Sequence, residues 1–212
     1  MKMLLSLGLL GFAMTFCGLG DKLKSLSGSS NTGSNSSSNS PSKTTATSGE
    51  AEKTDLTAAQ QKISDDAAEV KWDDQGISWR LPSGWKKTDM KKESALFSSP
   101  DAAFLIPTIS IMPDDFPSDV SLKATYDSSL QQLKNGKYES VRYVEIDGVK
   151  GVEWFETMPE DKSGPRRHQW IAFRNYQGQN QQLNMMLSTK GSNFDKHRDD
   201  FPAIMYSMKI GK

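Results

Sequence analysis

The chain has 212 residues, and its 26 Lys and Arg side chains balance 26 Asp and Glu side chains, so its formal net charge is zero. A balanced chain lacks the strong global field that attracts nucleic acid, and we expect no nucleic-acid partner. Its single cysteine, Cys17, excludes an intramolecular disulfide and any metal site built from several of its own cysteines. The mean hydropathy of −0.60 is low because residues 25–50 are almost wholly polar. The remainder is long enough to bury the core of one domain.

The first residues, MKMLLSLGLLGFAMTFCGLGDK, are typical of a secretory signal. Lys2 supplies a basic start, and the apolar run that ends at Phe16 is shorter than the roughly 20 residues that span a bilayer. No good Ala-x-Ala cleavage site is evident. Met14-Thr-Phe-Cys17 instead resembles a bacterial lipobox, with Met14 in place of Leu and Phe16 in place of a small residue.

By this resemblance residues 1–16 are a lipoprotein signal peptide and Cys17 is the lipidation site. Cys17 would carry a diacylglycerol thioether and become the first mature residue, and two or three acyl chains (palmitate among them) would hold it stably in membrane lipid. The alternative is an ordinary signal peptide that contains a cysteine by chance. Gly18, rather than Asp, is similar to the outer-membrane sorting pattern of some Gram-negative lipoproteins. We therefore expect the cell envelope, lipid-anchored to a bacterial membrane and facing the periplasm or the exterior.

Residues 17–54 are predicted to be a disordered tether rich in Ser, Asn and Thr, because they offer no apolar side chains for a core. A flexible stretch of about 30 residues has an r.m.s. span of roughly 30 Å, enough to hold a domain just off a membrane. Residues 55–69 are predicted as a short helical lead-in, with Thr54 or Asp55 as its N-cap.

Residues 70–212 are predicted to form an α+β domain, an antiparallel β-sheet with helices packed on its faces. A possible edge strand is expected at 70–72, further strands at 77–81, 95–97 and 108–112, and Pro100 and Pro107 are expected to interrupt them. A helix is predicted between Pro117 and Gly136, with one apolar face and a cap from Ser118, Asp119 or Ser121. The residues of that face are Leu122, Tyr126, Leu130 and Leu133.

The second half reads as hairpins and a last helix. Asp147-Gly148 predicts a tight hairpin turn, and Gln177-Gly178 predicts another. Strands 168–176 and 181–189 carry apolar residues on both faces, which favours cover on both sides. Residues 193–208 are predicted as a helix that Pro202 kinks or splits.

Four segments resemble the PsbP-like superfamily, which includes photosystem II PsbP, the Ran-binding Mog protein and DcrB-type bacterial lipoproteins. They are Gly76-Ile-Ser-Trp-Arg-Leu-Pro-Ser-Gly-Trp85, the helix 121–133, the hairpin 144–152 and the closing segment 201–210. The resemblance covers about residues 70–211 and implies an α/β/α sandwich that ends in a helix and a short strand. Members bind or help assemble other proteins. The superfamily shares no catalytic motif, so no functional residue carries over.

No signature of a hydrolase, a phosphate loop or a metal site is present, and we predict no catalytic, cofactor or metal residues and no enzyme. The candidates for a partner contact are Trp72 and the basic cluster Arg166-Arg167-His168. Each has a plainer interpretation, core packing for Trp72 and a solvated hairpin end for the cluster.

The favoured hypothesis is a membrane-anchored protein-interaction or envelope-assembly module with an unidentified envelope protein partner. One alternative is a small-ligand or metal carrier that uses a pocket between sheet and helix. The other is an envelope hydrolase built on His168 or His197. Buried polar groups converging on either histidine would favour the hydrolase.

Overall fold

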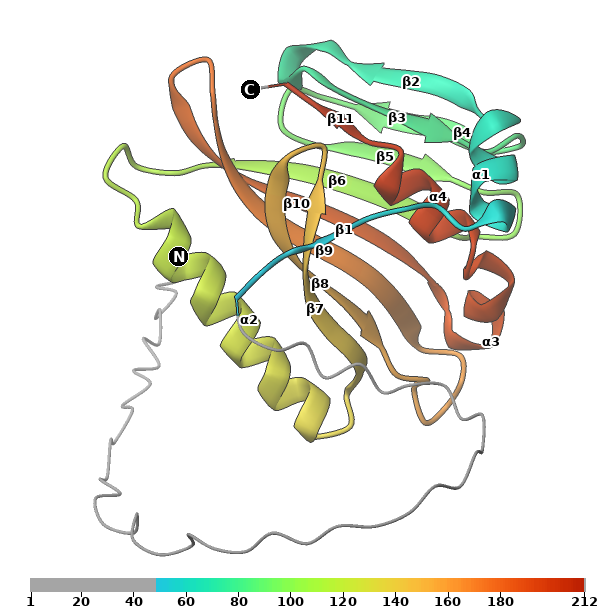
Figure 1. Ribbon diagram of the computed structural model, residues 1–212. Helices are drawn as coiled ribbons and strands as arrows, with labels where there is room; N and C mark the ends of the chain where they lie inside the picture. Colours follow the sequence, from blue (N-terminus) through green and yellow to red (C-terminus); the bar gives the residue numbers. More distant parts are fainter. Residues whose placement is uncertain (1–48, 212) are drawn as a thin grey trace, which may run out of the picture. The chain divides into compact units, whose positions relative to one another are not determined.

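The computed structural model describes residues 49–211, in which the strands form two sheets (Figure 1). The large sheet has the strand order β1-β7-β8-β9-β10-β6-β5-β4, and the small sheet has the order β11-β3-β2. Neighbouring strands are antiparallel except β1, which runs parallel to β7. This architecture confirms the α+β class predicted from the sequence. Cys17 and the predicted signal peptide lie outside the described residues.

The elements have the following bounds. The strands of the large sheet are β1 (Glu52–Lys53), β4 (Lys86–Met90), β5 (Ala95–Ser98), β6 (Phe104–Ile111), β7 (Tyr138–Ile146), β8 (Val149–Glu156), β9 (Pro165–Tyr176) and β10 (Gln179–Lys190). Those of the small sheet are β2 (Ala68–Trp72), β3 (Ile77–Leu81) and β11 (Lys209–Ile210). The helices are α1 (Ala58–Asp65), α2 (Ser118–Lys134), α3 (Gly191–Phe194) and α4 (Asp200–Tyr206), with 3-10 turns η1 (Asp73–Gln75) and η2 (Asp195–His197).

Helix α2 covers one face of the large sheet, where it contacts β7, β8 and β9 (Figure 1). Its inward side chains pack on a small apolar cluster of those strands, which confirms the predicted helix face. They are Leu122, Tyr126, Leu130 and Leu133. The helix ends at Lys134 with Asn135 as its C-cap, and Gly136 follows with a φ of 73°, a conformation that suits glycine.

The predicted helix caps are wrong at both positions. The N-cap of α2 is Pro117, and no side chain caps that end. The cap of α1 is Thr57, whose hydroxyl accepts a hydrogen bond from the backbone N–H of Gln60 at 3.3 Å. The Gln60 side chain accepts one from the N–H of Thr57 at 3.1 Å, which completes a capping box.

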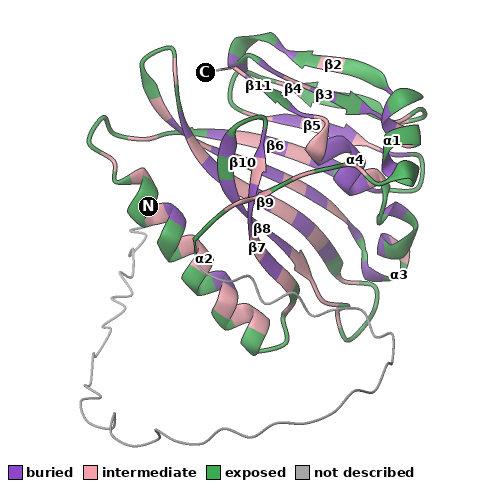
Figure 2. Ribbon diagram, viewed as in Figure 1, coloured by how far each residue is buried: buried purple, intermediate pink, exposed green. Residues whose placement is uncertain are grey.

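The opposite face of the large sheet packs against the small sheet, α3 and α4, with α1 lying against α4 (Figure 1). Inward and outward residues alternate along β6, β9 and β10 (Figure 2). Trp170 lies at the centre and is fully buried. Gly151 on the neighbouring strand leaves room for its indole, because a Cβ there would overlap the Trp170 ring.

Both predicted hairpin turns are confirmed. Asp147 and Gly148 have φ values of 48° and 77°, and Gln177 and Gly178 have 51° and 78°. Two successive positive φ values define the type I′ turn, whose twist matches that of the flanking strands. The turns therefore fix the register of β7 with β8 and of β9 with β10.

Pro107 lies inside β6 rather than between strands, so its prediction as a break is wrong. It pairs with Met185 of β10 and sits where the β5–β6 ladder is interrupted, between the Phe97–Leu105 pair and the Ser94–Thr108 bridge. A proline there forfeits no hydrogen bond on the β10 side. Strand β4 was missed altogether, because its residues are mostly exposed and show no apolar alternation.

The last helix is split, as predicted, into α3, η2 and α4. The break does not fall at Pro202, however, but at Arg198 and Asp199, and Pro202 is the third residue of α4. The first turn of a helix tolerates proline because its N–H groups have no intrahelical acceptor.

The folded part begins before the predicted tether boundary at residue 54. Glu52 and Lys53 pair with Val144 and Glu145 at the edge of β7. The Lys150 ammonium donates to the carbonyl of Gly49 at 2.6 Å. Strand pairing over so short a segment could not be predicted from a run of polar residues.

Candidate functional site

Trp72, the first candidate for a partner contact, is only 1% exposed. It ends β2 and pairs with Ile77, so its indole lies within the main core, and its Nε1 donates to the carbonyl of Lys91 at 2.8 Å. A buried and hydrogen-bonded indole offers no surface to a partner. The prediction of Trp72 as a contact residue is therefore wrong.

Successive side chains of β9 point to opposite faces of the sheet, so the three residues of the basic cluster do not share one face. Arg166 and His168 point into the protein and are 3% and 0% exposed, whereas the Arg167 side chain is 38% exposed. Arg166 donates to Glu139 at 2.5 Å and lies over the ring of Phe194. Arg166 and His168 are thus wrong as contact residues, and the three side chains do not form one surface patch. Arg167 stays a candidate.

His168 belongs instead to a buried polar network around Glu153, which is 1% exposed. One carboxylate oxygen of Glu153 accepts hydrogen bonds from His168 Nε2 at 2.7 Å and from the Tyr206 hydroxyl at 2.5 Å. The other oxygen accepts from Arg142 Nε at 2.6 Å. Arg142 also donates to Glu52 at 2.8 Å. The network thus links the core to β1 at the sheet edge.

Burial alone would raise the pKa of Glu153. The charges and hydrogen bonds of His168 and Arg142, with the hydroxyl of Tyr206, outweigh burial and lower that pKa to about 2. The His168 ring stacks on Phe155 with centroids 3.8 Å apart, and its Nδ1 has no hydrogen-bond partner among residues 49–211. A fully buried imidazole cannot reach a substrate, and we expect this network to contribute to the stability of the fold.

His197 forms a second polar cluster, near the surface. Its Nδ1 lies 2.9 Å from Asp200 Oδ2 and its Nε2 lies 3.1 Å from Asp101 Oδ2, so two carboxylates flank the imidazole. The hydrogen bond that His197 donates to Asp200 and the charges of both aspartates raise the pKa of His197. The ring also stacks on Phe201 with centroids 5.3 Å apart.

A short loop between β5 and β6 presents Asp101. The Ser99 hydroxyl accepts the N–H of Ala103 at 2.8 Å and donates to Asp101 Oδ1 at 2.6 Å. This bond, with contributions from Asn193 and His197, lowers the pKa of Asp101 to about 2. Asp101 is therefore a charged carboxylate at neutral pH.

A hollow of about 360 Å³ opens beside His197. We call it the Trp85 pocket, after the half-buried indole on its wall. Trp85 meets the His197 ring edge-on, with centroids 6.3 Å apart. The lining residues are Ile63, Asp66, Pro82, Ser83, Trp85, Ser99, Pro100, Asp101, His197 and Asp200.

This cluster does not have the geometry of a serine hydrolase. In such enzymes a serine hydroxyl is hydrogen-bonded to the histidine that removes its proton. Here His197 Nε2 faces Asp101, and the Ser99 hydroxyl donates to the same carboxylate. Buried polar residues do converge on both histidines, yet neither convergence pairs a nucleophile with a base.

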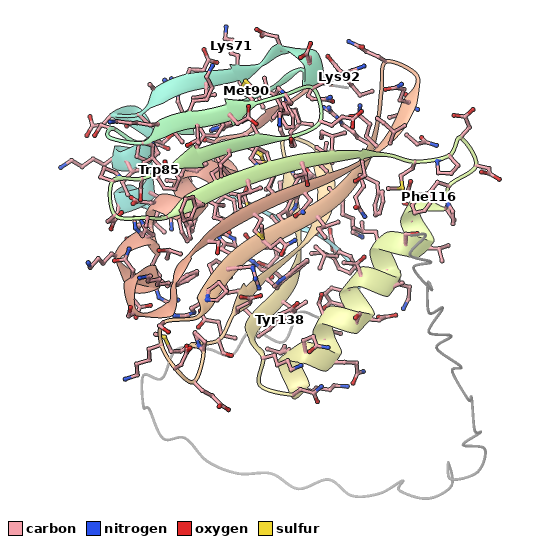
Figure 3. The ribbon with its side chains drawn as sticks, turned by 180° about the vertical axis from the view of Figure 1, so that it is seen from behind. Lys71, Trp85, Met90, Lys92, Phe116 and Tyr138 are labelled. Carbon is pink, nitrogen blue, oxygen red and sulfur yellow. The ribbon has the colours of Figure 1, made fainter. Side chains whose placement is uncertain are left out.

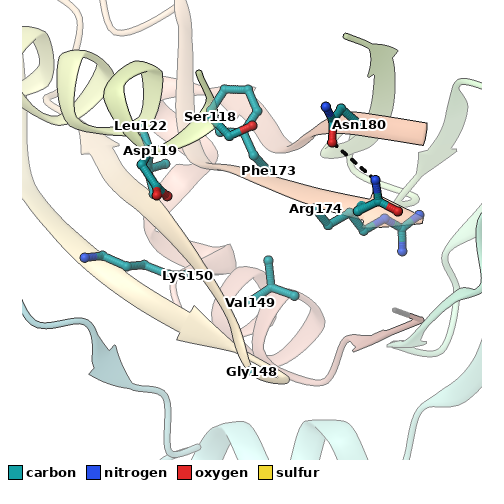
Figure 4. A pocket seen from close by; sticks show the side chains of 10 residues that line it. Ser118, Asp119, Leu122, Gly148, Val149, Lys150, Phe173, Arg174 and Asn180 are labelled. Atoms are coloured by element: carbon teal, nitrogen blue, oxygen red, sulfur yellow. Dashed lines mark hydrogen bonds between the residues drawn. The ribbon is translucent and has the colours of Figure 1, made fainter. Parts of the chain in front are cut away.

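A larger hollow of about 520 Å³ lies where α2 begins, beside the β7–β8 turn and β9 (Figure 4). The ammonium of Lys150 is bonded to Gly49 and lies over the Tyr143 ring. The guanidinium of Arg174 donates to the carbonyls of Gln75 and Gly211, and burial lowers its pKa to about 10. Both cations are thus engaged elsewhere, so this hollow is not an evident anion site.

Within residues 49–211, no group of three or more His, Cys, Asp or Glu side chains is placed to hold a metal ion. The Asp101 and Asp200 carboxylates illustrate the reason, because they bond opposite nitrogens of one imidazole and do not converge. No helix in this part of the chain is long and apolar enough to cross a membrane.

No protein-family model matches the chain, and no curated protein sequence matches it. Among solved structures, LpqN of Mycobacterium tuberculosis, described as involved in cell envelope biogenesis, is 13% identical with a TM-score of 0.51. That match covers 74% of this chain and 99% of LpqN. At this identity the likeness shows a shared fold, in agreement with the fold class predicted from the sequence.

Two further structures have lower scores. The cyanobacterial PsbP of Synechocystis is 14% identical with a TM-score of 0.43, over 69% of this chain and 94% of its own. A protein of Bacteroides thetaiotaomicron is 17% identical with a TM-score of 0.41, over 64% of this chain. This chain spans 45% of that protein, less than half of its length.

Proposed function

We propose that this chain is a cell-envelope lipoprotein, held to membrane lipid through acylated Cys17, whose folded domain binds an envelope protein partner. The lipobox resemblance and the polar segment that follows it support the anchor. The likeness to LpqN, a protein described as involved in cell envelope biogenesis, supports the location and the general role.

The observation that carries the interaction role is an area of the large sheet that no other element of residues 49–211 covers, which we call the open face. Helix α2 contacts β7, β8 and β9, and the sheet continues beyond them through β10 and β6. The outward residues there pair across the two strands as Phe104 with Ser188, Ile106 with Met186, and Thr108 with Asn184. Phe104 is exposed and the others are half-buried, and none is charged. Apolar side chains mixed with uncharged hydrogen-bonding groups are typical of the centre of a protein interface.

Site-specific crosslinking in intact membranes tests the interaction. A photoreactive amino acid replaces Asn184 on the open face, and a control replaces Val120, which is 68% exposed on α2. We expect a crosslinked protein from position 184 that is absent from position 120 and is lost on adding Met186→Asp. The same products from both positions, or none from position 184, would refute the proposed contact.

The lipid anchor is tested separately with Cys17→Ser. We expect the variant to leave the membrane fraction and to lose the mass of the acyl groups. An unchanged mass in the membrane fraction would show that Cys17 is not the anchor. Because this result does not depend on the open face, failure of either experiment leaves the other informative.

A small-ligand carrier is the second candidate, favoured by one observation. The hollow of about 520 Å³ lies between the start of α2 and the sheet, and its volume is within the range of small-molecule sites. Native mass spectrometry of protein purified from its own membranes would reveal a retained ligand. An enzyme remains the less favoured prediction, because neither histidine is hydrogen-bonded to a nucleophile.

A further inference from the structure

The side chains that line the Trp85 pocket include more acidic than basic groups. Three carboxylates line it, those of Asp66, Asp101 and Asp200, and neither Lys nor Arg is among the lining residues. His197 is the one lining group that can carry positive charge. Asp101 and Asp200 both contact that imidazole, whereas Asp66 forms no ion pair among the described residues. The pocket is therefore net negative.

Asp66 is also unfavourably placed within its own element. It is the C-cap of α1, where the helix dipole is negative and a carboxylate is repelled. Its side chain is exposed and lines the hollow. A cation in the pocket would interact favourably with both the carboxylate and the helix end.

The walls of the pocket suit a cation that carries apolar atoms. Trp85 is labelled in Figure 3, where β3 leads towards β4, and its indole is half-buried. Tryptophan is the aromatic side chain that attracts cations most strongly over its ring face. Ile63, Pro82 and Pro100 add apolar surface that could contact an alkyl stem.

The spacing of the carboxylates distinguishes an organic cation from a metal ion. Asp101 and Asp200 bond opposite edges of the His197 ring, so their oxygens cannot meet at one ion. A volume of about 360 Å³ is far larger than a bare ion needs and falls within the range of small-molecule sites. An ammonium or guanidinium group with its stem fits both the volume and the charge.

We propose that the Trp85 pocket binds an organic cation, a primary ammonium or guanidinium group on an alkyl stem. The group belongs either to a Lys or Arg side chain of a polypeptide or to a free small amine. This inference is independent of the open face and goes beyond the proposed function, since the pocket would bind its ligand whether or not a protein docks on the sheet.

Calorimetric titration of the full-length protein in a non-ionic detergent tests the proposal. The charged probe is Nα-acetyl-lysine methylamide, and the matched neutral probe is Nα-acetyl-norleucine methylamide, which lacks only the ammonium. We expect binding of the lysine probe and none of the norleucine probe. Equal affinity for the two, or no binding of the lysine probe at 10 mM, would overturn the proposal.

Variants assign the binding to this pocket. Asp66 is exposed, so Asp66→Asn leaves the core intact. We expect this variant to bind the lysine probe at least about fivefold more weakly. Trp85→Leu should weaken it by a similar factor through loss of the aromatic wall. Asp74→Asn, an exposed carboxylate of η1 outside the pocket lining, is the matched control and should change nothing. An unchanged affinity in Asp66→Asn and in Trp85→Leu would refute the site.

The source of the cation is distinguished with two further probes, cadaverine and Nα-acetyl-arginine methylamide. Tighter binding of the amide-bearing probes than of cadaverine indicates a polypeptide side chain. Binding of cadaverine at least as tight as that of the lysine probe indicates a free amine. Both results support an organic cation, and the ratio of the two affinities decides between its sources.

Discussion

Replacing Glu153 by glutamine tests whether the buried charge network stabilises the fold. Glutamine keeps the size of the side chain and one acceptor oxygen but removes the charge that His168, Arg142 and Tyr206 surround. Arg142 would then keep Glu52 as its only carboxylate partner in the network. Breaking a buried pair by neutralising one member leaves the other charge poorly compensated.

The magnitude follows from the pKa of Glu153, which falls from 4.5 to about 2 on folding. A depressed folded-state pKa contributes stability that is present above the unfolded-state value and is lost as the pH falls through the folded-state value. Each pKa unit corresponds to roughly 1.4 kcal/mol, so the ionised carboxylate contributes about 3 kcal/mol at pH 7 and about 1 kcal/mol at pH 3. We expect the free energy of unfolding of Glu153→Gln to be lower than that of wild type by about these amounts at the two pH values.

Urea unfolding of both proteins at pH 7, 5 and 3 measures the difference. Glu69→Gln is the matched control, because Glu69 is half exposed and lies 3.7 Å from Lys71 at the surface. We expect the free energy of unfolding of that control to stay within about 0.5 kcal/mol of the wild-type value at every pH. A loss in Glu153→Gln that is the same at pH 3 and pH 7 would refute the reasoning, because the effect would then come from packing rather than from charge.

Three further changes have expected outcomes. Gly151→Ala should destabilise the protein by about 2 kcal/mol or more in urea unfolding, because the added methyl group overlaps the Trp170 indole. Gly148→Ala should cost about 1 kcal/mol, since its φ of 77° disfavours a side chain, and a larger loss would indicate wider damage to the hairpin. The Asp200 hydrogen bond raises the pKa of His197 above 6.5, so its contribution is complete below pH 6.5 and is lost as the pH rises through the folded-state value. His197→Gln should remove that slope from a plot of stability against pH, and an unchanged slope would assign it to another group.

Local chemistry made several elements predictable. Leu122, Tyr126 and Leu130 recur at helical spacing, and this spacing alone places them on one face of α2. Asp147-Gly148 and Gln177-Gly178 are turns because residues of these types accept positive φ values. In each case the interactions that decide the structure lie within a few residues along the chain.

The polar clusters were not predictable in the same way. Glu153 and Tyr206 are 53 residues apart in sequence, and Asp101 and His197 are 96 apart. No pattern along the chain states that these pairs meet. A signal was nevertheless present, since Glu153 alternates along β8 with Val149, Gly151 and Phe155, so it shares a face with apolar residues, where a charge requires buried partners.

The sequence by itself determined the class of the fold, the hairpin turns and the face of α2, because these depend on composition and on short-range spacing. The lipid anchor at Cys17 stays a prediction. Only the tertiary structure decided that Trp72, Arg166 and His168 are buried. The alternation of side chains along a strand assigns each residue to one of two faces, but it does not determine which face packs against the core. Strand pairing and the packing of α4 make that choice, and they also open the Trp85 pocket among loops that lie far apart along the chain.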